Sequence, residues 1–106
     1  MMRNRKRRSD STYLVYVITN TVTQEQYIGI TVQNPGGIYK TLRRRIQKHV
    51  QRALAETKSW TLCQSIREHG PEAHTFGFLE RVRGRASAYT RERELIALYQ
   101  PQLNTF

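Results

Sequence analysis

A histidine and an arginine interrupt an otherwise amphipathic stretch of this sequence. Residues 39–55 have the hydrophobic period of a helix, with Leu42 and Ile46 on the apolar face. At about 100° per residue, His49 falls about 20° from Leu42, inside the apolar stripe, and Arg45 falls at its border. The two polar residues are one turn apart and share a face. Two interpretations fit: a satisfied core histidine beside an arginine that extends to solvent, or a pair positioned for chemistry.

A carboxylate is placed in a similar way near the end of the chain. Ala88, Leu95 and Tyr99 centre the apolar face of the last predicted helix, and Glu92 falls within about 40° of that centre. A carboxylate on a core-facing stripe is costly unless it is paired or binds a metal. Glu92 is therefore predicted either to pair with Arg45 or to serve as a metal ligand.

Two tyrosines and a glycine form the third unusual group. Tyr27 and Gly29 share one face of a predicted strand because side chains alternate along it, and Tyr16 lies on the preceding strand. Glycine inside a strand often marks the close approach of a ligand or another part of the chain. Each tyrosine could equally be an ordinary core residue with a satisfied hydroxyl.

Together these residue types fit the hydrolysis of a phosphodiester bond. An arginine can neutralise the charge that develops on the phosphate, and a carboxylate can hold one Mg²⁺. A tyrosine or a histidine can accept the proton of the attacking water. The five side chains are Tyr16, Tyr27, Arg45, His49 and Glu92, and the prediction requires them to converge beside Gly29.

The sequence predicts six elements that would position these residues. Apolar β-branched and aromatic runs indicate strands, and apolar residues at helical spacing indicate helices. In chain order the elements are strands at 12–18 and 26–31, helices at 39–55 and 59–69, a strand at 74–82 and a helix within 87–101. Ser59 and Ser87 are the predicted N-caps of the last two helices, and Gly70 and Pro101 are expected to mark their ends. The fold class is α+β, a small three-stranded antiparallel sheet flanked by helices in the order β-β-α-α-β-α.

Composition restricts the partners of the chain. Its 106 residues suffice for one domain, and 18 Lys and Arg against 8 Asp and Glu give a formal charge of +10. Such a balance favours polyanions, chiefly nucleic acid, as partners. The single cysteine, Cys63, cannot form an internal disulfide and is predicted to be a small core residue. We expect no membrane association and a cytoplasmic location, since no apolar run approaches a membrane span.

Positive charge is concentrated in two places. Residues 1–11 hold five basic side chains and no apolar ones beyond Met1 and Met2, which predicts a disordered tail preceding a domain at 12–106. The remaining domain keeps about +6. On the helix at 39–55, the side chains that turn away from the apolar stripe and are predicted to contact nucleic acid are Arg43, Arg44, Lys48 and Arg52. Plain solvated charge is the alternative for these residues.

Over residues 13–104 the sequence resembles the GIY-YIG nuclease family. The resemblance is carried by Tyr16 in LVYVI, by YIG at Tyr27 to Gly29, and by Arg45 and His49 in LRRRIQKH. It continues through REHGPEAHTFGFLE to Glu92 and to YQPQLN, which ends in Asn104. The first motif reads Leu-Val-Tyr, whereas a literal GIY at residues 37–39 follows YIG and is interpreted as a coincidence.

The resemblance implies a metal-dependent DNA endonuclease that leaves 5′-phosphate and 3′-hydroxyl ends. Glu92 would hold Mg²⁺ or Mn²⁺, and Arg45 would bind the scissile phosphate. Tyr27, helped by His49, would be the general base, while Tyr16 would position water or phosphate. Asn104 would hold the local hydrogen-bond network, and Gly29 would lie against the nucleic acid.

Similarity to the homing nucleases of this family favours a phage or mobile-element origin. Family members usually take their targeting from an attached DNA-binding domain, so we expect weak sequence preference, a homodimer or a separate DNA-targeting protein. The alternative from another class is a non-catalytic nucleic-acid-binding protein with a decayed nuclease fold, and an RNA-associated role is a further option. The basic residues would serve either of these equally well.

Deletion of residues 2–8 tests the role assigned to the basic tail. The deletion removes five positive charges, so fewer counterions should be released from DNA on binding. The plot of log affinity against log salt concentration should become flatter. An unchanged slope in a fluorescence-anisotropy titration would show that the tail does not contact the phosphates.

Overall fold

The computed structural model describes residues 11–56 and 58–104. The chain forms strand β1 (Thr12–Asn20), strand β2 (Gln26–Val32), helix α1 (Ile38–Leu54), helix α2 (Thr61–His69), a 3₁₀ turn (Pro71–Ala73), strand β3 (His74–Arg83) and helix α3 (Arg85–Tyr99). The order is the predicted β-β-α-α-β-α, and the α+β class is confirmed. Of the predicted tail at 1–11, only Ser11 lies among the described residues.

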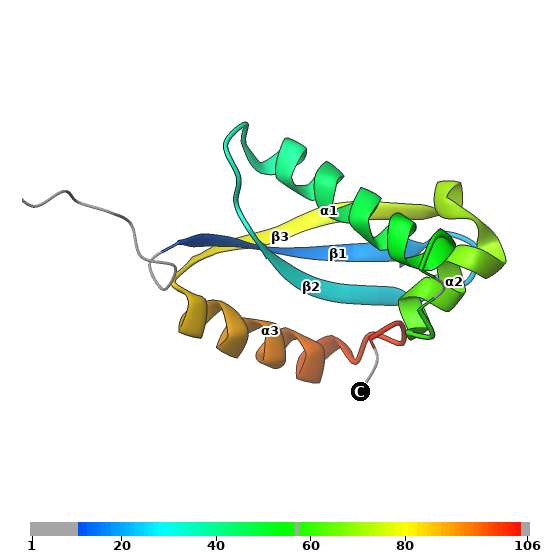
Figure 1. Cartoon of the computed structure of the whole chain (residues 1–106). Coiled ribbons are helices and arrows are strands. Elements are labelled where there is room, and N and C mark those ends of the chain that lie inside the picture. Colours follow the sequence, from blue (N-terminus) through cyan, green and yellow to red (C-terminus); the bar gives the residue numbers. More distant parts are fainter. Residues whose placement is uncertain (1–10, 57, 105–106) are drawn as a thin grey trace, which may run out of the picture.

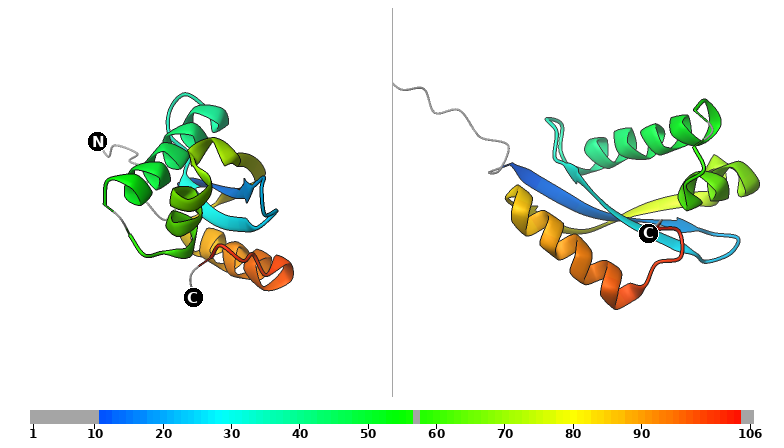
Figure 2. Two further views of the ribbon diagram at one scale, coloured as in Figure 1. Left: turned by 90° about the vertical axis from the view of Figure 1, so that its right-hand side faces the viewer. Right: turned by 60° about the horizontal axis from the view of Figure 1, so that its bottom comes forward.

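The three strands form an antiparallel sheet in the order β2-β1-β3. The central strand β1 is apolar on both faces because helices cover both (Figure 1). Leu14 and Ile18 pack with α1 and α2 on one face, whereas Val15 packs with Leu95 of α3 on the other. Figure 2 shows the same separation from two further directions.

The register between β1 and β2 determines which tyrosines meet. Tyr16 lies opposite Gly29, and Tyr27 is two residues from Gly29 on the same face. These side chains therefore point toward α1. Ile28 points to the opposite face, where it joins the cluster beneath α3. The predicted division of the strand into two faces is confirmed.

Helix α1 packs through the predicted stripe. Leu42 and Ala53 are buried, and Ile46 and Val50 are partly buried against the same core. Arg43 and Arg44 are exposed, as the pattern indicates. The literal GIY sequence lies at the start of this helix, with Tyr39 exposed, so it is remote from the two facing tyrosines.

Both predicted serine caps are wrong. Helix α2 begins at Thr61 after Trp60, and helix α3 begins at Arg85 after Gly84, with no side-chain cap at either start. Gly84 has a φ of 95° and its carbonyl accepts from the Ala88 amide, so the turn after β3 starts the helix three residues before Ser87 would. Propensity favours serine at a cap, but the length of the connection decides where the helix starts.

The predicted ends of α2 and α3 are confirmed, but Tyr99, which was predicted to face the core, is exposed. Gly70 ends α2 with a φ of 90°, although its ψ of 151° is not the left-handed helical value expected. Pro101 follows the end of α3 as predicted. Tyr99 was placed on the apolar face of α3, yet it is 59% exposed, because the helix diverges from the sheet toward its last turn (Figure 2).

A buried chain of polar side chains joins the end of β1, α2 and the start of β3. The Asn20 amide donates to Ser65 Oγ at 2.8 Å, and Ser65 Oγ lies 2.8 Å from His74 Nε2. His74 Nδ1 donates to the Gly70 carbonyl at 2.8 Å. Each of these buried polar groups is therefore satisfied, which fixes α2 against the sheet.

Replacing Ser65 with alanine should destabilise the domain by about 1–3 kcal/mol, because the Asn20 amide and His74 Nε2 would lose their buried partner. Ser87→Ala is the matched control. Ser87 is exposed inside α3, so its loss should change stability by no more than about 0.5 kcal/mol. Urea denaturation measures both. A loss of about 1 kcal/mol in Ser87→Ala would instead restore Ser87 as a helix cap.

Candidate active site

Tyr16 is the centre of a hydrogen-bonded group on the α1 face of the sheet. Its ring is 2% exposed. The hydroxyl lies 2.9 Å from His49 Nε2 and accepts from Arg45 Nε at 3.2 Å. Arg45 and His49 come from consecutive turns of α1, so one helix and one strand bring three of the predicted residues together. The interpretation of Arg45 and His49 as a positioned pair accounts for this geometry.

Gly29 makes room for the two tyrosines. A Cβ atom at this position would lie 2.7 Å from the Tyr16 hydroxyl oxygen and 2.8 Å from the Tyr27 ring. The close approach that the glycine predicted is therefore made by side chains of the same sheet. Contact between Gly29 and nucleic acid stays a prediction.

Tyr27 lies on the open side of this group. Its ring meets the His49 ring edge-on, with 5.2 Å between centroids and 70° between planes, and its centroid is 6.2 Å from that of Tyr16. Unlike Tyr16 it is only partly buried. Tyr27 is thus the tyrosine that a substrate could reach.

Burial determines the protonation of the group. Burial and the positive charges of Arg45 and Arg52 lower the pKa of His49 from 6.5 to about 4, so its imidazole is neutral at pH 7. Burial also raises the pKa of Tyr16 well above its ordinary value, and raises that of Tyr27 despite the opposing effect of Arg45. Both phenols are therefore protonated at neutral pH.

Arg45 keeps its charge in this setting. Burial acts to lower its pKa, but the two tyrosines and Glu92 together hold the pKa above its usual value. The guanidinium is only partly buried. Besides its bond to Tyr16, Arg45 lines a cavity of about 330 Å³ together with Asn34, Arg85 and Tyr89. It can therefore meet a phosphate with a permanent positive charge.

Glu92 approaches from the other layer of the fold. It lies on α3, which covers the sheet face opposite α1 (Figure 1). Its carboxylate nevertheless acts on both Tyr27 and Arg45, contributing to the raised pKa of each. Burial raises the pKa of Glu92 itself, and Arg93 and Arg45 oppose that rise.

The predicted pairing of Glu92 with Arg45 is absent from the part of the chain that the structure describes, where Glu92 makes no ion pair or hydrogen bond. Its neighbour Arg91 instead pairs with Glu80, at 2.6 Å, and with Glu94, at 3.2 Å. Glu94 is exposed and turned away from the tyrosines. The Glu92 carboxylate is the one left available for a ligand near Arg45.

Asn104 binds the edge of β2. Its Oδ1 accepts from the Ile28 amide and its Nδ2 donates to the Ile28 carbonyl, both at 2.9 Å. Next to it, the Leu103 amide donates to the Gln26 carbonyl at 2.9 Å. Asn104 thus acts as a further strand would, and fixes β2 between Tyr27 and Gly29.

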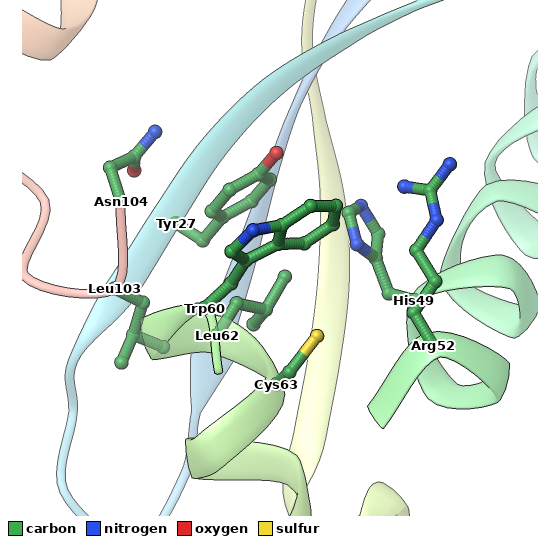
Figure 3. Close-up of a pocket in the computed structure, with 8 residues that line it drawn as sticks. All are labelled: Tyr27, His49, Arg52, Trp60, Leu62, Cys63, Leu103 and Asn104. Atoms are coloured by element: carbon green, nitrogen blue, oxygen red, sulfur yellow. The ribbon is translucent and has the colours of Figure 1, made fainter. Parts of the chain in front are cut away.

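A cavity of about 310 Å³ opens beside Tyr27 and His49 (Figure 3). Its other walls come from α1, from the start of α2 and from the chain after α3. The residues that line it are Tyr27, His49, Arg52, Trp60, Leu62, Cys63, Leu103 and Asn104. Three predicted catalytic residues therefore border one hollow, together with Arg52.

Sequence reasoning missed Trp60 in this wall. It also treated Cys63 only as a core residue, which its complete burial confirms, although burial raises the pKa of its thiol at the floor of the cavity. The signal for Trp60 was available: a lone tryptophan in the polar run KSWT between two helices. Arg43, Arg44 and Lys48 are exposed on the far side of α1, and their contact with nucleic acid stays a prediction.

Comparison with models of protein families assigns this fold and this arrangement of residues to one known family. Residues 12–105 match the family model of the GIY-YIG catalytic domain. The chain belongs to the GIY-YIG family. Comparison with curated proteins and with solved structures gave no match. The family match covers nearly all of the described chain and gives a nuclease-type fold, for which DNA is the implied substrate.

No helix among residues 11–56 and 58–104 combines the length and the apolar character required to cross a bilayer. In the same residues, no three His, Cys, Asp or Glu side chains are grouped as a metal cluster would require.

The depressed pKa of His49 predicts a loss of stability in mild acid. Between pH 6.5 and about 4 the unfolded chain binds a proton at this histidine and the folded chain does not. Stability should therefore fall as the pH falls through this range, by at most roughly 3 kcal/mol, since one pKa unit is worth about 1.4 kcal/mol. In His49→Gln this part of the pH dependence should disappear. A His49 imidazole resonance that titrates near pH 6.5 in an NMR experiment would contradict the prediction.

Proposed function

We propose that this protein is a metal-dependent DNA endonuclease that hydrolyses phosphodiester bonds. The observation that supports it best is the combination of a fixed guanidinium and an unpaired carboxylate around Tyr27. Arg45 is oriented by Tyr16, and Glu92 is half-buried and acts electrostatically on Arg45 without pairing with it. A protein that only binds nucleic acid has little reason to keep a carboxylate where it would repel phosphate.

Arg45 is the proposed phosphate-binding residue. Its Nε donates to the Tyr16 oxygen, which leaves the two terminal nitrogens of the guanidinium to face a ligand. Tyr16 is itself immobilised between β1 and α1, so the guanidinium has little freedom to turn. A preorganised cation of this kind stabilises charge that develops in the transition state more than it stabilises the ground state.

Tyr27 is the proposed acceptor of the water proton, with His49 as its helper. Because burial raises the pKa of Tyr27, the phenol carries its own proton at neutral pH and passes it to the neutral His49 imidazole or to solvent as it accepts one from the attacking water. The neighbouring imidazole is neutral, with a pKa of about 4, and is already hydrogen-bonded to Tyr16. Tyr16 is too buried to accept the proton, so we assign it the positioning of Arg45.

Glu92 is the proposed ligand of Mg²⁺ or Mn²⁺. Mg²⁺ is commonly bound through one or two carboxylates together with waters and substrate phosphates. A single carboxylate without a protein partner, close to a phosphate-binding arginine, fits that donor set. When bound, the metal would neutralise charge on the leaving 3′ oxygen.

One active site of this kind cuts one strand. A double-strand break would therefore require two domains, as in a homodimer, or two successive visits. We retain the phage or mobile-element setting and the alternative of a separate targeting protein as part of the proposal.

The second candidate is a nucleic-acid-binding protein with a decayed nuclease fold. The observation that favours it is the exposed basic surface of α1, formed by Arg43, Arg44 and Lys48. Both candidates bind DNA, so only cleavage distinguishes them.

Nicking of supercoiled plasmid with Mg²⁺ and with chelator tests the proposal. Glu92→Gln and Arg45→Ala should each reduce nicking by about 10²-fold or more, because each removes a charge that acts in the transition state. Glu94→Gln and Lys40→Ala are matched controls on the same helices with exposed side chains, and should retain activity within a few-fold. Circular dichroism confirms that each variant is folded.

Binding of Mn²⁺ to the DNA complex gives a measurement independent of turnover. Electron paramagnetic resonance should show weaker binding in Glu92→Gln than in Glu94→Gln. Full nicking by Glu92→Gln, or chelator-resistant nicking by the unmodified protein, would overturn the metal assignment. Absence of nicking by the unmodified protein under all metal conditions would favour the binding protein.

A further inference from the structure

One wall of the cavity beside Tyr27 and His49 is an exposed aromatic ring with no proposed catalytic role. Trp60, the only tryptophan in the chain, is 43% exposed just before α2. Figure 3 shows its indole across the mouth of the cavity from Tyr27 and His49. A partly exposed tryptophan at the entrance of a hollow offers an indole face on which a flat ligand can stack.

Two cations flank this ring. The Arg52 guanidinium and the Lys58 ammonium each lie 5.6 Å from the centroid of the indole. Such pairs hold the ring in place and put positive charge beside its face. An aromatic platform bordered by basic side chains is the combination with which proteins hold unpaired nucleic acid, since the ring stacks on a base and the cations meet its phosphates.

His49, which lines the cavity, carries an unsatisfied polar atom. His49 is 3% exposed, and its Nδ1 is buried without a hydrogen-bond partner, whereas Nε2 is occupied by Tyr16. In either tautomer Nδ1 requires a partner, as donor or as acceptor. The edge of a nucleobase offers both kinds of group, so it can satisfy this atom where a phosphate could meet only the donor form.

The remaining surfaces suit a flat, mostly apolar ligand. Leu62, Cys63 and Leu103 form the floor, and the volume of about 310 Å³ lies at the small end of ligand sites. Tyr27 forms the boundary between this cavity and Arg45. A ligand here would therefore lie against Tyr27, the residue proposed to accept the proton of the attacking water.

We propose that this cavity receives one unstacked nucleobase of the cleaved strand, adjacent to the scissile phosphate, with its ring against Trp60. The inference rests on the proposed endonuclease function and specifies its substrate. Because a base must leave the helical stack to enter, the preferred substrates are DNAs in which that base is unpaired. Mismatched, gapped or single-stranded positions release a base at lower cost than a perfect duplex does.

Fluorescence of the single tryptophan tests the stacking directly. The experiment uses the Glu92→Gln chain, which should bind without cutting, and an oligothymidine of eight nucleotides. Stacking should quench the Trp60 emission and saturate with binding. An abasic oligonucleotide of the same length and charge should bind through its phosphates and leave the emission nearly unchanged. Equal quenching by both, or none by either despite binding measured by anisotropy, would overturn the proposal.

Cleavage supplies the second measurement. On a duplex with one unpaired base beside the cut, Trp60→Ala should lower the rate by about tenfold or more, the order that loss of a base–aromatic stack produces. Trp60→Phe should keep most of the rate, and Tyr99→Ala, which removes another exposed aromatic ring, should keep all of it. Thermal melting confirms that Trp60→Ala is folded. Equal loss in Trp60→Phe and Trp60→Ala would contradict stacking.

The two proposals can fail separately. If the unmodified protein does not nick DNA but thymidine still quenches Trp60, the cavity binds a base and the endonuclease assignment is wrong. If nicking depends on Glu92 and Arg45 but Trp60→Ala cuts every substrate at the normal rate, the nuclease stands and the base pocket is wrong.

Discussion

The hydroxyl of Tyr16 is the interaction on which the rest of the site depends. It is buried between the sheet and α1, where a polar group without partners would be costly, and it meets both His49 and Arg45. Satisfying this one oxygen fixes the imidazole and the guanidinium at the same time. Gly29 is required by the same constraint, because any side chain there would occupy the space of the two tyrosine rings. The packing that forms the core of the domain therefore also orients its proposed catalytic groups.

The position of β2 at the edge of the sheet gives the site its second layer. Helix α1 supplies Arg45 and His49 from one face, and α3 carries Glu92 on the other (Figure 1). A carboxylate and an arginine on opposite layers can influence each other here without forming an ion pair among the described residues. Asn104 pairs with the free edge of β2 and prevents this strand from shifting. An edge strand that is held in place can therefore present Tyr27 to both layers and to solvent.

Partial burial determines the electrostatic state of every group in the site. It keeps both phenols protonated, holds His49 neutral and raises the pKa of Glu92, while Arg45 keeps its positive charge. A phosphodiester entering this environment meets one fixed cation rather than a diffuse positive surface. The exposed arginines of α1 lie outside this group, where long-range attraction can act without disturbing it, whereas the cation-flanked Trp60 shares a cavity with Tyr27 and His49.

The sequence by itself determined the order of the elements, the two-sided burial of β1 and the face shared by Arg45 and His49. These follow from hydrophobic period and residue type, which act over a few neighbouring positions. It also indicated that Glu92 was unusual, but not whether it pairs with Arg45, because that depends on the distance between α1 and α3 across the sheet. Only the tertiary structure decided that α2 starts at Thr61 and α3 at Arg85. It also decided that Tyr99 is exposed and that Trp60 forms a wall of the cavity. Turn geometry, the divergence of α3 from the sheet, and contacts between residues far apart in the chain have no periodic signal, so only the folded packing could settle them.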